Sequence, residues 1–306
     1  MTLAPHFLST QHLTQEYIFL LIKKAQLYLN PQGKLQPSPT LLKNKIVANL
    51  FFENSTRTRC SFEISAQKLG AYTLNFNAQT ASTQKGESLL DTVKNLVAMG
   101  TDLLVIRHPE SGLPAWLAKQ IAIPIINAGD GSNEHPTQAM LDVLTIYCHK
   151  PNFTSLTIAI IGDIRHSRVA KSLCFALHTL GVKDIRLIGP PAFLPEENFP
   201  LSRISFCNDL LTGIQDADIV MTLRIQHERF NKEEISFDLN DYIQRYKLTS
   251  VAMKHARPDA IVMHPGPINR GVEIESDVAD GAQSLILEQP TFGVAMRMAI
   301  MSELLF

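Results

Sequence analysis

The sequence predicts an α/β protein of two domains, each a parallel β-sheet flanked by helices. The first observation is the length of 306 residues, because one domain takes roughly 150 residues. The second is that short apolar runs alternate with amphipathic helical windows from residue 45 onward, which is typical of parallel sheets. The third is a composition of 45% hydrophobic and 19% charged residues, which excludes collagen, coiled coil and disorder.

The first predicted element is a helix near the N-terminus, which is expected to cover one face of a domain. Its apolar residues recur at helical spacing, at Ile18, Leu21, Ile22 and Ala25. Two groups of four candidate strands follow. They are 46–52, 72–76, 103–107 and 124–127, and then 157–161, 185–188, 219–223 and 260–263. Each group predicts the sheet of one domain.

The predicted domain boundary lies between residues 134 and 135. Small and turn-forming residues crowd together over 129–133, just before a helix that is expected to begin near Pro136. We therefore expect one domain over 1–134 and a second over 135–291. The last helical window, 292–306, is apolar enough to pack against a domain, and we assign it to the first.

Composition also limits the partners and the compartment. The chain has 28 Lys+Arg against 29 Asp+Glu and no basic stripe, so we expect no nucleic acid. The apolar stretch 17–22 is too short for a membrane span. The cysteines, at positions 60, 148, 174 and 207, lack C-x2-C spacing and read as reduced thiols of a cytoplasmic protein. The histidines lack metal-ligand spacing and no G-x-G-x-x-G follows 157–161, so we expect no metal and no nicotinamide cofactor.

The strongest local signal is the run Phe-Phe-Glu-Asn-Ser-Thr-Arg-Thr-Arg over 51–59, between a predicted strand and a helical window. Hydroxyl groups at a helix start cap its free N–H groups, and that end of a helix also attracts anions. Three hydroxyls and two guanidinium groups within five residues predict a phosphate or acyl phosphate as ligand. The alternative is a capped helix with solvated arginines. The G-x4-G-K-[ST] pattern of ATP sites is absent.

A second signal lies at the start of the helix near Pro136. His135 and Gln138 are three residues apart, so both side chains can face one point, where the histidine donates to a carbonyl oxygen and the glutamine binds an amide. A histidine beside a helix start is more often structural than catalytic. Arg107 favours the catalytic interpretation, because it ends a predicted strand and ligands of open α/β sheets bind at those ends.

These motifs together resemble the aspartate/ornithine carbamoyltransferase family. The shared segments are 55–59 (Ser-Thr-Arg-Thr-Arg), 107–109 (Arg-His-Pro), 135–138 (His-Pro-Thr-Gln) and 264–267 (His-Pro-Gly-Pro). Segments 85–92, 162–170, 223–230 and 269–274 make the resemblance closer to the aspartate branch. The ornithine branch carries a cysteine where Pro265 stands here. The resemblance covers nearly the whole chain.

The resemblance implies transfer of a carbamoyl group from carbamoyl phosphate to the α-amino group of L-aspartate in pyrimidine biosynthesis. The products are N-carbamoyl-L-aspartate and phosphate, with no cofactor and no covalent enzyme intermediate. The alternatives are an ornithine-type carbamoyltransferase and a non-catalytic, carbamoyltransferase-like scaffold subunit. A homotrimer with shared active sites is also implied. Regulatory or dihydroorotase partners, nucleotide regulation and the proton acceptor stay open; the departing phosphate is one candidate acceptor.

The resemblance also implies a role for each site residue. The groups that hold carbamoyl phosphate are Ser55, Thr56, Arg57, Thr58, Lys85, Arg107, His135 and Gln138. Arg57, Thr58, Arg107 and His135 are the implied catalytic residues, and Gln138 binds the carbamoyl amino group. Aspartate is bound by Lys85, Arg168, Arg224 and Gln226, and the backbone at Pro265 and Gly266 touches both substrates. Lys85 enters a neighbouring subunit's site, where either Ser82 or Thr83 replaces the family's serine, since Ala81 stands at its position.

Overall fold

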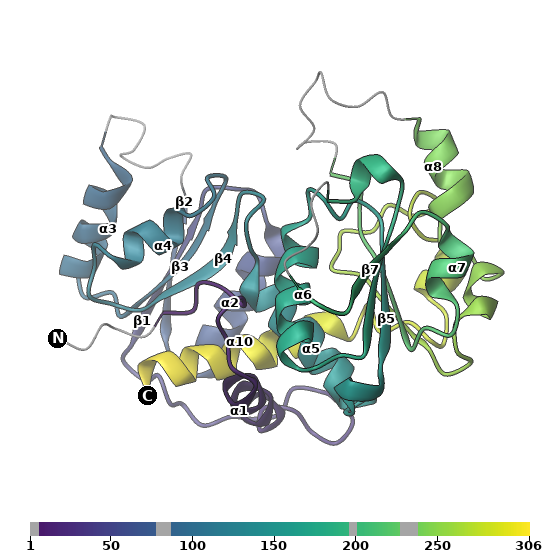
Figure 1. Cartoon of the computed structure of the whole chain (residues 1–306). Helices are drawn as coiled ribbons and strands as arrows, with labels where there is room; N and C mark the ends of the chain where they lie inside the picture. Colours follow the sequence, from purple (N-terminus) through teal and green to yellow (C-terminus); the bar gives the residue numbers. More distant parts are fainter. Residues whose placement is uncertain (1–5, 78–86, 196–200, 227–237) are drawn as a thin grey trace. The chain divides into compact units, whose positions relative to one another are not determined.

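The structure is a computed structural model that describes residues 6–77, 87–195, 201–226 and 238–306 (Figure 1). It divides into two compact units. The first contains Met1–Leu144 and Pro290–Phe306, and the second contains Thr145–Gln289. Each unit is built on its own parallel sheet flanked by helices, so the predicted fold class is confirmed.

The first unit carries a four-stranded sheet in the order β2-β1-β3-β4, with all strands parallel. Its elements are α1 (Gln15–Gln26), β1 (Ile46–Phe51), α2 (Thr56–Lys68), β2 (Tyr72–Asn77), α3 (Leu89–Ala98), β3 (Leu103–His108), α4 (Leu113–Ala118), β4 (Ile125–Asp130), most of α5 (Pro136–His149) and α10 (Gln289–Leu305). The central strands are buried on both faces, which explains their continuous apolar runs. The segment before α1 extends the sheet, because Phe7 N donates to Ile125 O at 2.8 Å.

The last helix of the chain, α10, lies beside the first, α1 (Figure 1). Lys24 forms an ion pair with Glu303, and Tyr28 OH donates to Ser302 Oγ at 3.3 Å. The helix α1 begins where Thr14 caps it by accepting a hydrogen bond from Tyr17 N. The two ends of the chain therefore cover the same unit.

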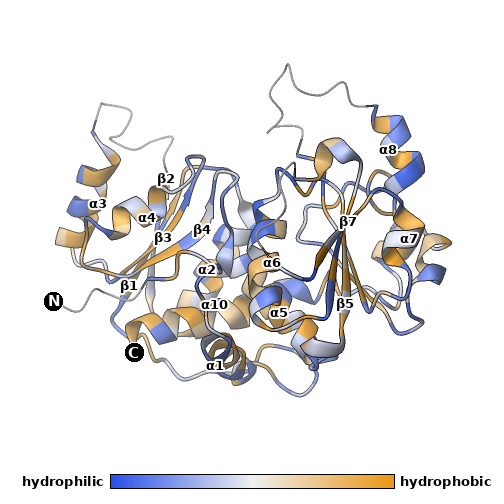
Figure 2. Cartoon of the chain, in the orientation of Figure 1, coloured by the Kyte–Doolittle hydropathy of each residue, from blue (hydrophilic) through white to orange (hydrophobic). Residues whose placement is uncertain are grey.

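The second unit carries a five-stranded parallel sheet in the order β7-β6-β5-β8-β9. Its elements are β5 (Thr157–Ile161), α6 (Arg168–Thr179), β6 (Asp184–Ile188), β7 (Ile204–Cys207), α7 (Leu210–Ile214), β8 (Ile219–Thr222), α8 (Leu239–Tyr246), β9 (Ile261–Met263) and α9 (Ser276–Ala279), with short 3-10 turns at Phe153–Ser155, Pro191–Phe193 and Ala252–His255. In Figure 2, hydrophobic colouring is common on the strands of the second sheet, whereas α8 carries both hydrophobic and hydrophilic residues. No helix in the described ranges is long and apolar enough to cross a membrane.

The prediction of four strands in the second unit is wrong by one, because β7 was missed. This strand lies at the edge of its sheet, with Ser205 and Phe206 exposed and neither flanking residue fully buried. An edge strand buries little apolar surface, so its sequence lacks the apolar run that reveals a central strand. The other strands overlap the ranges that the sequence predicts.

The division between the units falls inside α5, between Leu144 and Thr145, whereas the sequence places it before that helix. The reason is that the first part of α5 packs on α10. A Cβ atom added at Gly293 would lie 3.1 Å from Leu141 Cδ2, so the two helices are in close contact there. Glycine-rich turns mark a helix start, but only packing decides to which core that helix belongs.

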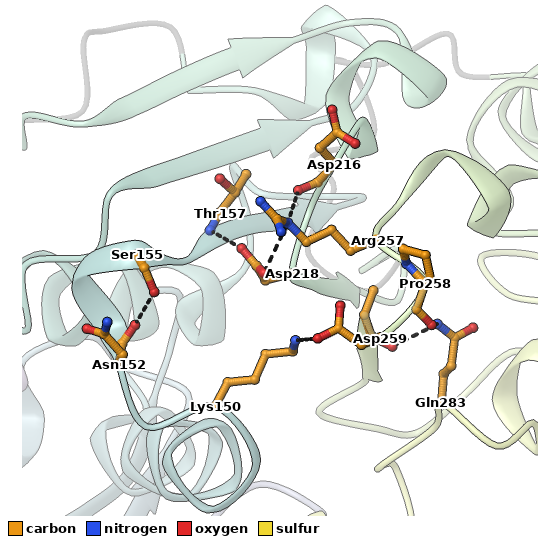
Figure 3. Close-up of polar contacts among 11 residues, drawn as sticks. Lys150, Asn152, Ser155, Thr157, Asp216, Asp218, Arg257, Pro258, Asp259 and Gln283 are labelled. Atoms are coloured by element: carbon orange, nitrogen blue, oxygen red, sulfur yellow. Dashed lines mark hydrogen bonds and ion pairs between the residues drawn. The ribbon is translucent and has the colours of Figure 1, made fainter.

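The amino end of the second sheet is closed by ion pairs (Figure 3). Asp218, directly before β8, accepts from Thr157 N at 2.9 Å and pairs with Arg257 at 3.3 Å. Lys150 donates to Asp259 at 2.7 Å in the same region. Arg257 and Lys150 at this end are thus matched by carboxylates.

The first sheet uses the same device. Asp102, directly before β3, accepts from Ile46 N at 2.8 Å and from Lys45 Nζ at 2.9 Å. In both sheets an aspartate therefore binds the first N–H of the neighbouring strand and one cation. The candidate site residues lie at the opposite, carboxyl ends.

Candidate functional site

The first group of candidate residues lies where the strand order of the first sheet reverses. The chain runs from β1 outward to β2 and then returns to β3 on the other side of β1. Ser55 follows β1, and Arg107 lies within the last residues of β3. The carboxyl ends of strands at such a reversal are where open α/β sheets bind ligands. The structure therefore brings these two residues to the same edge of the first sheet.

The helix α2 begins at this edge with the predicted hydroxyl and arginine residues. Ser55 occupies the N-cap position but makes no side-chain capping bond, so the expected capping role is wrong for this residue. Thr56 and Arg57 are exposed, Thr58 is 8% exposed, and the first turn has no acidic residue. The positive end of α2 is therefore open to an anion.

Arg107 is held between the neighbouring strands. Its Nε donates to Glu53 Oε2 at 3.1 Å, and its Nη1 lies 3.4 Å from Ala128 O. Glu53 follows β1, and Ala128 belongs to β4, so contacts on both sides set the direction of the guanidinium group. These contacts hold the guanidinium group of Arg107 at the carboxyl end of β3.

The loop before His135 is organised by Asp130, which is fully buried at the end of β4. Its carboxylate accepts from Gly112 N at 2.7 Å, Asn127 Nδ2 at 2.8 Å, Asn133 Nδ2 at 3.0 Å and Glu134 N at 3.1 Å. Hydrogen bonds to a buried charged acceptor are strong, so this turn is fixed.

Only glycine fits at position 131 of the same turn. A Cβ atom there would lie 2.7 Å from Pro109 O, and the φ of Gly131 is +48°. His135 follows at the start of α5 and is 4% exposed. The turn thus positions the buried imidazole of His135 at the start of α5.

Glu134 is a residue that the sequence analysis missed. Its carboxylate accepts from Thr10 N at 2.9 Å, from Thr10 Oγ1 at 3.0 Å and from Ser9 Oγ. The residue is 3% exposed, so the N-terminal segment anchors the residue directly before His135. No local spacing could reveal this contact, because the partners are 124 and 125 residues apart.

The second group of candidate residues lies at the reversal of the second sheet. The chain runs from β5 outward through β6 to β7 and returns to β8 beside β5. Arg168 opens the helix after β5, while Arg224 and Gln226 follow β8. Pro265 and Gly266 follow β9, the next strand. Three adjacent strands thus carry these residues at the same edge of the sheet.

Asp163 joins the segments after β5 and β8. Its Oδ1 lies 2.8 Å from His166 Nδ1, and its Oδ2 accepts from Gln226 N at 3.3 Å. Asp163 is fully buried, and Arg168 is 3% exposed. This carboxylate, which the sequence analysis also missed, holds His166, just before Arg168, and the backbone of Gln226, just after Arg224.

The loop after β9 is held by His264, which is 2% exposed. Gly266 N donates to His264 Nδ1 at 2.7 Å, so the other ring nitrogen carries the proton and donates to Glu273 Oε1 at 3.1 Å. Glu273 also accepts from Asn269 N at 2.6 Å. These bonds set the backbone of Pro265 and Gly266. The φ of Gly266, +68°, is one that favours glycine.

Lys85, Ala81, Ser82 and Thr83 lie outside the described residues. Within the described ranges, no three His, Cys, Asp or Glu side chains form a group that could hold a metal ion. The described candidates are cations, hydroxyls and amides at the reversal points of two parallel sheets. They define a class of α/β protein that binds small anionic ligands.

Two parts of the chain match models of one protein family. Residues 5–148 match "Aspartate/ornithine carbamoyltransferase, carbamoyl-P binding domain", and residues 154–304 match "Aspartate/ornithine carbamoyltransferase, Asp/Orn binding domain". The chain therefore belongs to the aspartate/ornithine carbamoyltransferase family.

Solved structures of this family are similar over nearly the full chain. Aspartate transcarbamoylase from Trypanosoma cruzi with carbamoyl aspartate and phosphate has 32% identity and a TM-score of 0.89, covering 99% of this chain and 97% of that one. The same enzyme with N-(phosphonacetyl)-L-aspartic acid has 31% identity and a TM-score of 0.87, covering 99% and 96%. Ornithine carbamoyltransferase from Pyrococcus furiosus has 26% identity and a TM-score of 0.84, covering 98% and 97%.

Proposed function

We propose that this chain transfers the carbamoyl group of carbamoyl phosphate to the α-amino group of L-aspartate, giving N-carbamoyl-L-aspartate and phosphate. The observation that carries the proposal is the pair Arg168 and Arg224, which follow the adjacent strands β5 and β8 of the second sheet. Two guanidinium groups suit a substrate with two carboxylates. The similarity to structures of aspartate transcarbamoylase with substrates and products supports the same reaction.

The first unit binds carbamoyl phosphate. The hydroxyls of Ser55, Thr56 and Thr58 and the guanidinium group of Arg57 hold the phosphate at the positive end of α2, together with Lys85. Thr58, Arg107 and His135 bind the carbamoyl oxygen, and Gln138 binds the carbamoyl amino group. The open helix start and the tied arginine support this division of roles.

The catalytic groups stabilise charge that grows during the reaction. As the amine attacks the carbonyl carbon, negative charge develops first on the carbamoyl oxygen and then on the departing phosphate. Arg107 and His135 donate to the oxygen, with Thr58 beside them, and Arg57 stabilises the phosphate. The departing phosphate accepts the proton that the amine loses. No cofactor takes part in these steps.

The second unit binds L-aspartate. Arg168, Arg224 and Gln226 contact the substrate from the ends of β5 and β8, together with Lys85. The backbone at Pro265 and Gly266 touches both substrates. Arginines offset the repulsion between two anionic substrates, which the nearly neutral chain as a whole would not do.

Specificity for the amine distinguishes the candidate functions. We expect the purified chain with carbamoyl phosphate to release phosphate rapidly with L-aspartate and hardly at all with L-ornithine, because two arginines repel a cationic side chain. A coupled phosphate assay measures both rates. Equal or reversed rates indicate an ornithine-type enzyme, and no release with either amine indicates a non-catalytic scaffold subunit.

We also propose that the chain forms a homotrimer in which Lys85 enters the neighbouring subunit's site. The first unit exposes large apolar side chains on α2 and β2, with Ile64 at 41%, Tyr72 at 66% and Leu74 at 41%. The strand β2 is the edge of its sheet. An apolar sheet edge is typical of a surface that another chain covers, which supports a closed ring of subunits.

Subunit mixing tests the shared site. We expect Arg57→Ala and Lys85→Ala trimers to be nearly inactive by themselves. A mixture that is dissociated and reassembled should regain activity, in at most about one site in three of each mixed trimer, where intact Arg57 meets intact Lys85. Phosphate release before and after mixing measures the gain. No gain after verified subunit exchange places Lys85 in its own subunit's site or outside catalysis.

We propose further that the chain acts in pyrimidine biosynthesis, as the family resemblance implies, and in the cytoplasm. Its four cysteines are free thiols, as in proteins of reducing compartments. Whether a regulatory chain or a dihydroorotase joins the homotrimer is decided by native mass measurement of the complex from its own cells.

A further inference from the structure

The side-chain amide of Gln138 is held in one orientation by Asp142. The two residues are four apart on α5, so their side chains lie on the same face of the helix, one turn apart. Gln138 Nε2 donates to Asp142 Oδ1 at 3.0 Å. Gln138 is 8% exposed and Asp142 is 0% exposed, so water competes little for this hydrogen bond.

Asp142 lies near a buried cation. Arg297 of α10 is 3% exposed, its Nη1 donates to Ser61 Oγ at 2.8 Å, and its Cζ lies 4.9 Å from the centre of the Phe62 ring. Burial lowers the pKa of Arg297 to about 10, against the attraction of Asp142, so this side chain is charged at neutral pH. A Cβ atom at Gly293 would lie 2.6 Å from Arg297 Nη1, so glycine makes room for the cation.

The chemistry of the pair decides which end of the Gln138 amide faces Asp142. A carboxylate only accepts hydrogen bonds, whereas an amide has an NH2 donor at one end and a carbonyl acceptor at the other. The NH2 group therefore faces Asp142, and Gln138 Oε1 faces away from it. Arg297 has only donors, so it matches a carboxylate and does not match an amide NH2 group.

We propose that Asp142 and Arg297 make the acyl phosphate site select an NH2 group over a methyl group, because they hold Gln138 Oε1 toward the acyl substituent. This inference rests on the proposed function, which places Gln138 at the carbamoyl amino group. An NH2 group donates to Oε1, and a methyl group of similar size cannot. Asp142 and Arg297 are positioning residues, since they act through Gln138.

The variant Asp142→Asn reverses the amide. The positive charge of Arg297 acts on position 142 and attracts the oxygen of the introduced amide, so its NH2 group faces Gln138. Gln138 then directs its own NH2 group at the ligand. We expect phosphonoacetamide to bind about tenfold more weakly, and acetonylphosphonate to stay within about twofold of wild type. These stable phosphonates differ only in NH2 against methyl, so the ratio of their Kd values from calorimetry reports the Gln138 amide.

The variant Arg297→Lys is the control for damage to packing. It keeps the cation and the carboxylate but loses the planar group above Phe62. We expect a lower Tm and an unchanged ratio of Kd values. If Asp142→Asn does not fold, the double variant Asp142→Asn with Arg297→Gln removes both buried charges. Its ratio should fall toward one, because Gln138 has lost its acceptor-only partner.

The inference is overturned if a folded Asp142 variant keeps the wild-type ratio, or if Arg297→Lys lowers the ratio as much as Asp142→Asn does. Wild-type protein that binds neither phosphonate contradicts both this inference and the proposed function. Wild-type protein that binds both equally, and still transfers carbamoyl groups to aspartate, overturns the selectivity role alone.

Discussion

Replacing Arg57 by alanine is expected to lower kcat/KM for carbamoyl phosphate by about 10³-fold or more, since the departing phosphate loses a charged donor at the open start of α2. Arg57 is exposed and lies in the first helical turn, so its removal leaves the core of the unit intact. Phosphate release at varied carbamoyl phosphate measures the effect, and calorimetry with inorganic phosphate measures the loss of binding.

The matched control for this prediction is Lys68→Ala. Lys68 is an exposed cation of the same helix, in its last turn, about 16 Å along the axis from Arg57. Lys68→Ala changes the net charge by the same amount as Arg57→Ala. It should leave kcat/KM within about twofold of wild type, because salt screens the effect of a distant charge. If both variants lost activity equally, the phosphate would be held by the overall charge of the helix and not by Arg57.

Replacing His135 by alanine is expected to lower kcat by about 10²- to 10³-fold, the usual cost of removing one donor to a developing oxyanion. Asp130 and Glu134 fix the backbone before His135 from both sides, so the loss should be confined to the imidazole. We expect little change in the KM for aspartate, which belongs to the second unit. Steady-state kinetics with both substrates varied separates the two parameters.

A histidine of the same helix provides the control for this second prediction. His149 lies in the last turn of α5, where its Nδ1 contacts Thr145 O at 3.0 Å. His149→Ala should keep wild-type kcat. A large rise in the KM for aspartate in His135→Ala, with kcat preserved, would mean that His135 binds aspartate and takes no part in stabilising the carbamoyl oxygen.

Local sequence was informative where a function depends on neighbouring residues. The run 51–59 joins a strand end to a helix start within nine residues, so its spacing alone predicts an anion site. The limit of such patterns is shown by the missed strand β7 and by Ser55, whose side chain does not cap α2. A short edge strand has no apolar run, and a hydroxyl at the N-cap position does not by itself form the capping bond.

The sequence by itself determined the α/β class, the central strands and the residue types at each strand end, because burial on both faces and helix starts leave periodic, local patterns. The tertiary structure decided which strands are neighbours, and so which ends meet at a reversal of the sheet. It also paired Glu134 with Thr10, and Arg297 with Ser61. The hydrogen-bond partners of these buried charges are distant in sequence, so only the packing of the core brings them together.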